Sequence, residues 1–198
     1  MEVEPASLFC FDPTPGIRFF APMSDLKAGF TELILAEHSR KQAELIAAEV
    51  GPDAERFAVF WALMEHGQPP LPQRASYAMM VLVTQHPFLF DPFWNRAITM
   101  LERDYHIAVH RHLLRVMTDL TLPKEAESLG RLANYCFGVL QNATQPVGLQ
   151  VNAMQVLFNI CQLEPELSGE LRMVIESLLP YGTSGFNSRA KRLLKKLK

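Results

Sequence analysis

The stretch Val147 to Leu157 reads Val-Gly-Leu-Gln-Val-Asn-Ala-Met-Gln-Val-Leu, and it is the clearest copy of a helical pattern that occurs five times in this chain. Its central residue is Ala153, and the apolar residues Val156 and Leu157 follow three and four positions later. Residues at this spacing lie on one side of an α-helix. The pattern therefore predicts an apolar helix face with a small residue at its centre, where two packed helices approach closely.

The central residues of the five copies are separated by 35, 35, 40 and 37 positions, which is a repeat spacing. They are Ala43, Ala78, Leu113, Ala153 and Ala190. Leu113 is the one large member, so the third copy is the weakest. Repeats of this length form structures in which each unit stacks on its neighbours.

Prolines mark the ends of the expected helices from residue 52 onward, as short stacked helices require. Asp91-Pro92 opens one of these helices, with Asp91 as its N-cap. The first helices of the pairs are predicted at 38–50, 72–85, 107–120, 146–162 and 186–197, and the second helices at 52–65, 91–102, 124–141 and 165–178. No run alternates with a period of two between hairpin signals, so we expect an all-α chain.

The paired helices, the period and the Ala-Met-x-Val-Leu core resemble HEAT-like α-solenoids. The closing stretch, Glu-Pro-Glu-Leu-Ser-Gly-Glu-Leu-Arg-Met-Val-Ile-Glu from Glu164 and Ser-Gly-Phe-Asn-Ser-Arg-Ala-Lys-Arg-Leu-Leu-Lys-Lys from Ser184, is similar to the end of small bacterial HEAT-like proteins without an established activity. The resemblance implies a right-handed α-α superhelix of about five helical hairpins over residues 38–198. Residues 1–37 then form an N-terminal arm and capping segment.

The first 22 residues carry an aromatic pattern that is not helical. Phe9, Phe11, Phe19 and Phe20 are interleaved with prolines and a glycine. One interpretation is an extended arm that covers the apolar face of the first helix pair, as terminal repeats require. The other is an aromatic segment that docks on a partner.

Composition indicates a protein outside membranes. Hydrophobic residues make up 48% of the chain and charged residues 20%, and no apolar stretch approaches the roughly 20 residues that span a bilayer. No secretory signal precedes the repeats, so we expect a cytoplasmic protein. Cys136 and Cys161 lie among apolar residues at helical spacing, which predicts buried reduced thiols, and Cys10 lies outside the repeats.

Charge is distributed unevenly along the chain. The first 188 residues hold 13 of the 19 basic residues and all 21 acidic ones, and the remaining basic residues lie between Arg189 and Lys198. An acidic body is a poor surface for nucleic acid, whose affinity rests on lysine and arginine. The basic end is either an exposed helix cap or a site for nucleic acid or an acidic partner.

The densest set of possible metal ligands is His106, His110 and His112, with acidic residues nearby. His106 and His110 are one helical turn apart, a workable spacing for one metal ion. The cluster lacks a His-Glu-x-x-His motif, however, and the inward face of this helix is expected to leave His112 pointing away from the core. We therefore predict no metal and no cofactor. Signatures of catalysis such as Gly-x-Ser-x-Gly and the P-loop are also missing, so no enzymatic activity is predicted.

The second helices commonly line the concave surface of HEAT-like arrays. By that resemblance, Trp94, Arg96, Arg131 and Tyr135 are the predicted partner-binding residues, and their types often dominate binding energy. The alternative is that Trp94 belongs to the core and the arginines are solvated.

The favoured function is a non-enzymatic scaffold or interaction module that binds a protein partner on its concave face or at an exposed end. Two alternatives remain open: a nucleic-acid-binding or DNA-repair HEAT-like protein, and an enzyme or metal protein of unrecognised type. Self-association through an open end of the solenoid is also possible.

Overall fold

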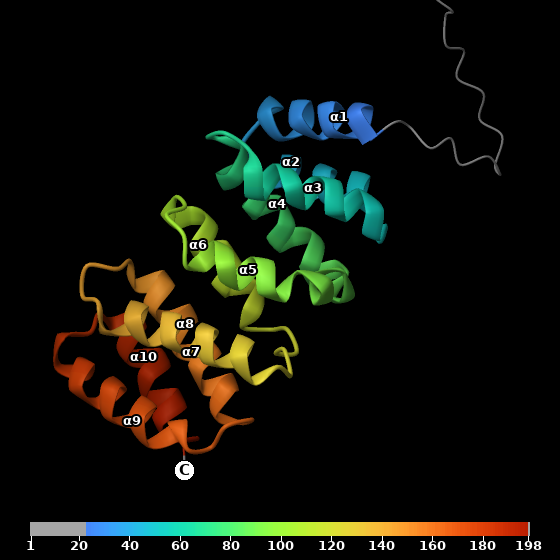
Figure 1. Ribbon diagram of the computed structural model, residues 1–198. Coiled ribbons are helices and arrows are strands. Elements are labelled where there is room, and N and C mark those ends of the chain that lie inside the picture. Colours follow the sequence, from blue (N-terminus) through green and yellow to red (C-terminus); the bar gives the residue numbers. More distant parts are fainter. Residues whose placement is uncertain (1–22, 198) are drawn as a thin grey trace, which may run out of the picture.

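A computed structural model describes residues 23–197, which form ten α-helices and two short 3-10 helices in a continuous stack (Figure 1). The elements are α1 (Met23–Ala36), α2 (Arg40–Val50), α3 (Ala54–His66), α4 (Leu71–Gln85), η1 (Pro87–Phe93), α5 (Trp94–Leu101), α6 (Ile107–Met117), α7 (Ala126–Gln141), α8 (Val147–Cys161), α9 (Leu167–Leu178), η2 (Leu179–Tyr181) and α10 (Ser184–Leu194).

The helices form two layers. The even-numbered helices α2, α4, α6, α8 and α10 contact one another in series, and each contains one copy of the repeated pattern. In the other layer α1 contacts α3, and α5, α7 and α9 contact one another in series. The odd-numbered helices lie toward the viewer in Figure 1. The predicted all-α solenoid is confirmed.

The central residues of the repeats lie where neighbouring helices meet. Ala43 is 2% exposed, and Ala78, Leu113, Ala153 and Ala190 are completely buried. Val156 and Leu157, which complete the clearest copy, are completely buried as well. The repeated residues therefore form the continuous core that joins one helix pair to the next.

An aromatic cluster joins α3 to η1 and α5. The ring centroids of Trp61 and Phe93 are 4.7 Å apart, and those of Phe57 and Phe93 are 5.1 Å apart in an edge-to-face arrangement. Phe90 and Trp94 are likewise in edge-to-face contact at 5.1 Å. Such pairs contribute about 0.5–1.5 kcal/mol beyond the area they bury. Through Phe90, the cluster links α3 to α5, which is the shortest α-helix among the described residues.

The predicted helix start at Asp91 is wrong. Residues Pro87–Phe93 form the 3-10 helix η1, α5 begins only at Trp94, and no side chain caps it. Pro92 would also fit the first turn of an α-helix, so the reason lies in packing: the tighter 3-10 turns place Leu89, Phe90 and Phe93 in the core.

Helix α1 was not predicted from the sequence, in which no helix was expected before residue 38. It contacts α2, α3 and α4, and its residues Phe30 and Ile34 are buried four positions apart on one face. α1 thus covers the first end of the stack. The boundary at residue 37 stays a prediction, and the aromatic arm and Cys10 lie outside the described residues.

Two further expectations concern cysteines and membranes. Cys136 and Cys161 are buried free thiols, as predicted, and burial raises the pKa of both. Within residues 23–197, no helix combines the length and the apolar character needed to cross a bilayer.

Enlarging a central residue should loosen the stack. Ala153→Leu adds volume at a completely buried position of α8, and we expect it to lower the free energy of unfolding by about 1–3 kcal/mol. Urea denaturation followed by circular dichroism measures the change. Ala58→Leu is the matched control, because Ala58 is an exposed position of α3. Equal effects of the two substitutions would contradict the close-packing argument.

Candidate functional site

The four predicted partner-binding residues lie on the odd-numbered layer, in α5 and α7. Trp94 is 6% exposed and belongs to the aromatic cluster. Arg96 forms an ion pair with Glu65 at the end of α3, and Arg131 forms one with Glu102, the residue after α5. The side chains thus have intramolecular partners, and none of these four residues lines the hollow of the even-numbered layer described below.

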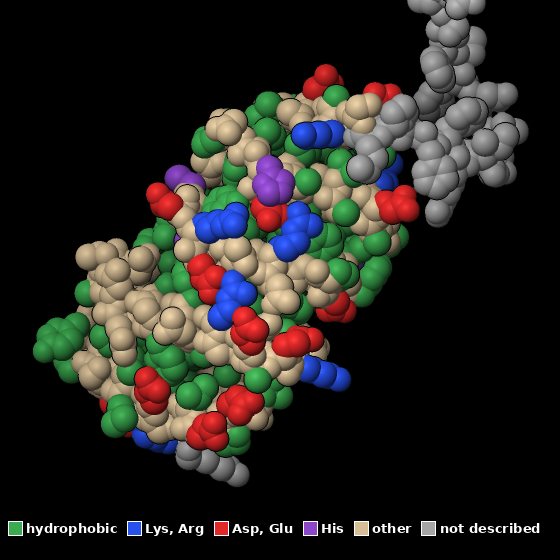
Figure 2. All heavy atoms as spheres, in the orientation of Figure 1, with side chains coloured by type: hydrophobic (Ala, Val, Ile, Leu, Met, Phe, Trp, Pro, Cys, Tyr) green, Lys and Arg blue, Asp and Glu red, His purple; other side chains and the backbone are tan. Residues whose placement is uncertain are grey.

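The two ion pairs connect successive odd-numbered helices. Glu65 accepts hydrogen bonds from Arg96 Nε at 2.8 Å and from Trp61 Nε1 at 3.0 Å. Glu102 accepts one from Arg131 Nε at 3.0 Å, and this bond holds the pKa of Glu102 below its ordinary value. Acidic and basic side chains accordingly lie next to one another across the middle of the face in Figure 2.

The three histidines have separate structural roles. His106 caps α6, where its Nδ1 accepts a hydrogen bond from the backbone N–H of Ala108 at 3.2 Å. His110 Nδ1 lies 2.7 Å from the hydroxyl oxygen of Tyr135 on α7. This contact fixes Tyr135, the fourth predicted binding residue. No group of three or more His, Cys, Asp or Glu side chains in residues 23–197 is placed to hold a metal ion.

The expectation that His112 points away from the core is wrong. His112 is 8% exposed, its Nδ1 lies 2.9 Å from Ser76 Oγ, and its ring packs against Tyr77. The reason is that α6 lies between α4 and α8, so the position before its central residue faces α4. The pKa of His112 is lowered to about 4, mainly by burial and to a smaller extent by the charges of Arg111 and His38.

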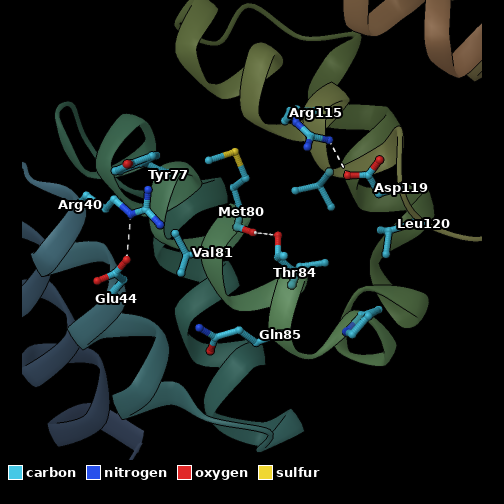
Figure 3. Close-up of a pocket in the computed structure, with 13 residues that line it drawn as sticks. Arg40, Glu44, Tyr77, Met80, Val81, Thr84, Gln85, Arg115, Asp119 and Leu120 are labelled. Atoms are coloured by element: carbon cyan, nitrogen blue, oxygen red, sulfur yellow. Dashed lines mark hydrogen bonds and ion pairs between the residues drawn. The ribbon is translucent and has the colours of Figure 1, made fainter.

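The even-numbered layer carries a hollow of about 460 Å³ that crosses α2, α4 and α6 (Figure 3). An Arg40–Glu44 ion pair borders it on α2, and an Arg115–Asp119 ion pair borders it on α6. The apolar part of the lining comes from Tyr77, Met80, Val81, Val83, Pro87, Val116 and Leu120. The hollow therefore offers apolar surface between charged groups of both signs.

A second hollow, of about 540 Å³, lies between η1 and the loop that precedes α7. Its lining includes Phe88, which is 55% exposed, and the edge of Trp94. Asn95 also lines it and accepts a hydrogen bond from Ser128 Oγ at 2.6 Å. Of the four predicted partner-binding residues, only Trp94 lines this hollow.

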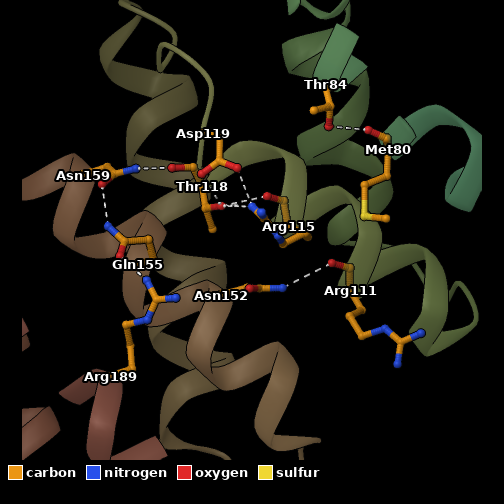
Figure 4. A network of polar contacts seen from close by, with 10 residues as sticks. All are labelled: Met80, Thr84, Arg111, Arg115, Thr118, Asp119, Asn152, Gln155, Asn159 and Arg189. Carbon is orange, nitrogen blue, oxygen red and sulfur yellow. Dashed lines mark hydrogen bonds and ion pairs between the residues drawn. The ribbon is translucent and has the colours of Figure 1, made fainter. Parts of the chain in front are cut away.

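A polar network continues the even-numbered layer from α6 to α10 (Figure 4). The amide of Asn159 donates to the carbonyl oxygen of Thr118 at 2.9 Å, and Gln155 donates to Asn159 Oδ1 at 2.8 Å. Arg189 of α10 donates to Gln155 Oε1 at 2.6 Å. The network orients Arg189 across α8 toward α6.

Charge separates between the two layers. The even-numbered helices contain eight basic and two acidic residues, whereas the odd-numbered helices contain five basic and seven acidic ones. The eight basic residues are Arg40, Lys41, Arg74, Arg111, Arg115, Arg189, Lys191 and Arg192. Sequence reasoning missed this separation, because it treated the basic residues of the last helix as part of a tail. The available signal was the helical spacing of Arg111 and Arg115.

Stacked helix pairs in two layers define a helical repeat protein of the α-solenoid class. A family model described as HEAT repeat domain matches residues 30–197, and the chain belongs to the HEAT repeat family. Repeats of this family generally mediate protein interactions, and the family is typically non-enzymatic. No curated protein and no solved structure gives a significant match to the chain.

The two ion pairs of the odd-numbered layer should differ in strength. Arg96→Met leaves the Glu65 side chain, which is 10% exposed, with only Trp61 as a side-chain donor, so we expect a loss of about 2–3 kcal/mol. Arg131→Met frees the more exposed Glu102 and should cost less than about 1 kcal/mol. Chemical denaturation of both variants tests the order, and a larger loss for Arg131→Met would contradict it.

The free energy of unfolding should fall as the pH drops from about 6.5 to about 4. His112 binds a proton in the unfolded chain near pH 6.5 but in the folded protein only near pH 4, so acid favours unfolding, by on the order of 3 kcal/mol. His110, whose pKa is lowered by burial, contributes with the same sign. Urea denaturation at several pH values across this range measures the change, and the free energy of unfolding of His112→Phe should depend less steeply on pH than that of the wild-type protein. An unchanged slope in His112→Phe would contradict the assignment.

Proposed function

We propose that this protein is a non-enzymatic interaction module that binds a protein partner along the face of its even-numbered helices. The observation that supports this most directly is the hollow across α2, α4 and α6. Its apolar centre can bury side chains of a partner, and its charged borders can orient them. Because three successive repeats contribute to it, the bound segment would lie across the stack.

The groups that line this hollow suit binding better than catalysis. Its charged residues form the two i,i+4 ion pairs, Arg40–Glu44 and Arg115–Asp119, and their carboxylates are well exposed. The groups with strongly shifted pKa, such as His112 and Cys136, are buried elsewhere and do not line the hollow. A catalytic site usually needs such groups converging on a pocket.

Binding through Trp94, Arg96, Arg131 and Tyr135 is a second proposal for the location of the partner. Its support is the 540 Å³ hollow that reaches Trp94. A partner on this face would have to compete with Glu65 and Glu102 for the two arginines, which makes the even-numbered face the stronger candidate.

A bulky residue in the hollow should abolish partner capture. Thr84 is an exposed lining residue of α4, and Thr84→Trp fills the space between α4 and α6 without removing an ion pair. The tagged full-length protein is purified from its own cells after cross-linking, and captured proteins are quantified by mass spectrometry. We expect a partner of the wild-type protein to be reduced at least about tenfold with Thr84→Trp.

Asn134→Trp is the matched control, because Asn134 is an exposed position of α7 in the other layer. A partner that is retained with this variant and lost with Thr84→Trp supports the even-numbered face. A partner lost only with Asn134→Trp would instead favour binding through Trp94, Arg96, Arg131 and Tyr135. Capture that neither variant changes would contradict both locations.

A further inference from the structure

The even-numbered face carries two parallel stripes of arginines with an uncharged stripe between them. Arg111 and Arg115 are four residues apart on α6, and Arg189 and Arg192 are three apart on α10, so each pair shares a helix side. Between them α8 presents the amide side chains of Asn152, Gln155 and Asn159, and no charged residue occurs in α8. We call the four arginines the arginine cluster.

The positive charges of the arginine cluster are only partly compensated. Arg115 pairs with Asp119, whereas Arg111 and Arg192 form no ion pair with any residue that the structure describes. Arg189 contacts the neutral amide of Gln155. The pKa of Arg189 is lowered mainly by burial and, to a smaller extent, by the charges of Arg192 and Arg115. The charge of Asp119 acts in the opposite direction. The two stripes therefore act on one another electrostatically, with Asp119 as the nearby acidic group.

The like charges of the arginine cluster differ from the pattern of an ordinary solvated helix face. A solvated face of a stable helix usually mixes charges of both signs, as the odd-numbered layer does with its Glu65–Arg96 and Glu102–Arg131 pairs. The guanidinium of Arg111 extends away from α8 in Figure 4, and Arg111 and Arg192 are both exposed. A ligand with several negative charges would relieve the repulsion and gain charge-assisted hydrogen bonds.

The arginine cluster adjoins the apolar hollow, and this limits the ligand. Arg115 belongs to both, and Val116 and Leu120 of the hollow lie one and five positions after it on the chain. A ligand that covers both surfaces carries acidic side chains and apolar side chains in one segment. Protein segments meet this condition, because carboxylates pair with guanidinium groups in bidentate geometry and aliphatic side chains fill the hollow.

From this juxtaposition we propose that the even-numbered face binds an acidic protein segment, with carboxylates at Arg111, Arg115, Arg189 and Arg192 and apolar side chains in the neighbouring hollow. This inference rests on the proposed function and specifies the chemistry of the partner.

Nucleic acid fits the same face less well. Single strands bind by stacking bases on aromatic rings as well as by phosphate contacts. Tyr77 is the one aromatic residue that lines the hollow, and its ring is already in contact with His112 and His38. Glu44 and Asp119 also lie at the borders, and the chain as a whole carries a net charge of −2. Each of these features opposes a continuous phosphate track.

The test uses the full-length protein and three fluorescent probes of equal length: a peptide of Glu-Glu-Leu repeats, a peptide of Gln-Gln-Leu repeats and oligothymidylate. Fluorescence anisotropy measures their dissociation constants. We expect the Glu peptide to bind at least about tenfold more tightly than either other probe, since each charged hydrogen bond contributes about 1.5–3 kcal/mol. Added salt should weaken its binding.

The double variant Arg111→Gln, Arg192→Gln removes the two unpaired charges without breaking an ion pair. It should weaken binding of the Glu peptide at least about tenfold. The control Lys27→Gln with Lys124→Gln removes the same charge from exposed positions elsewhere and should change binding less than about twofold. Circular dichroism confirms that both variants are folded.

Three results would overturn the proposal: no saturable binding of the Glu peptide, equal binding of the Glu and Gln peptides, or tighter binding of oligothymidylate. Equal losses in the two double variants would overturn the assignment to the arginine cluster. A different result would contradict the proposed binding face: a cellular partner captured equally by the wild-type protein and by Thr84→Trp. A partner lost with Thr84→Trp but retained with Arg111→Gln and Arg192→Gln would support the face and refute its acidic ligand.

Discussion

The structure depends on the close approach of the even-numbered helices at their small central residues. Ala43, Ala78, Ala153 and Ala190 are buried where one helix meets the next, and a larger side chain there would push the layers apart. Because every contact of this kind joins only neighbours, the chain extends as a stack and leaves two long faces exposed to solvent. All candidate sites of this protein lie on those faces.

The charged side chains of the two faces are arranged in different ways. On the odd-numbered layer, Arg96 and Arg131 bridge successive helices through Glu65 and Glu102, so its charges are neutralised within the protein. On the even-numbered layer, amides of α8 donate to backbone oxygens at α6 and position Arg189. Beside them Arg115 pairs with Asp119, whereas Arg111 and Arg192 form no ion pair with a described residue. Intramolecular pairing therefore neutralises more of the positive charge on the odd-numbered layer than on the even-numbered one.

Most of the fold was predictable, because the small central residues, the apolar residues after them and the prolines between helices each act over one or two turns. The errors concern longer-range effects. Phe30 and Ile34 lie on the face of α1 that is buried in the stack, and α1 contacts three other helices. Residues Pro87–Phe93 form a 3-10 helix, which places Phe90 and Phe93 in the aromatic cluster. His112 is buried because α4 lies beside it.

The sequence by itself determined that this chain is an α-solenoid of the HEAT repeat family, since helix periodicity and repeat spacing are local properties of the chain. Tertiary structure alone decided which charged residues share a surface. Arg115 and Arg192 are far apart in sequence, but each stands two positions after the central residue of its repeat, and α6 and α10 both pack against α8. Stacking converts the same position in successive repeats into neighbours, and the partners of each charge follow from that packing.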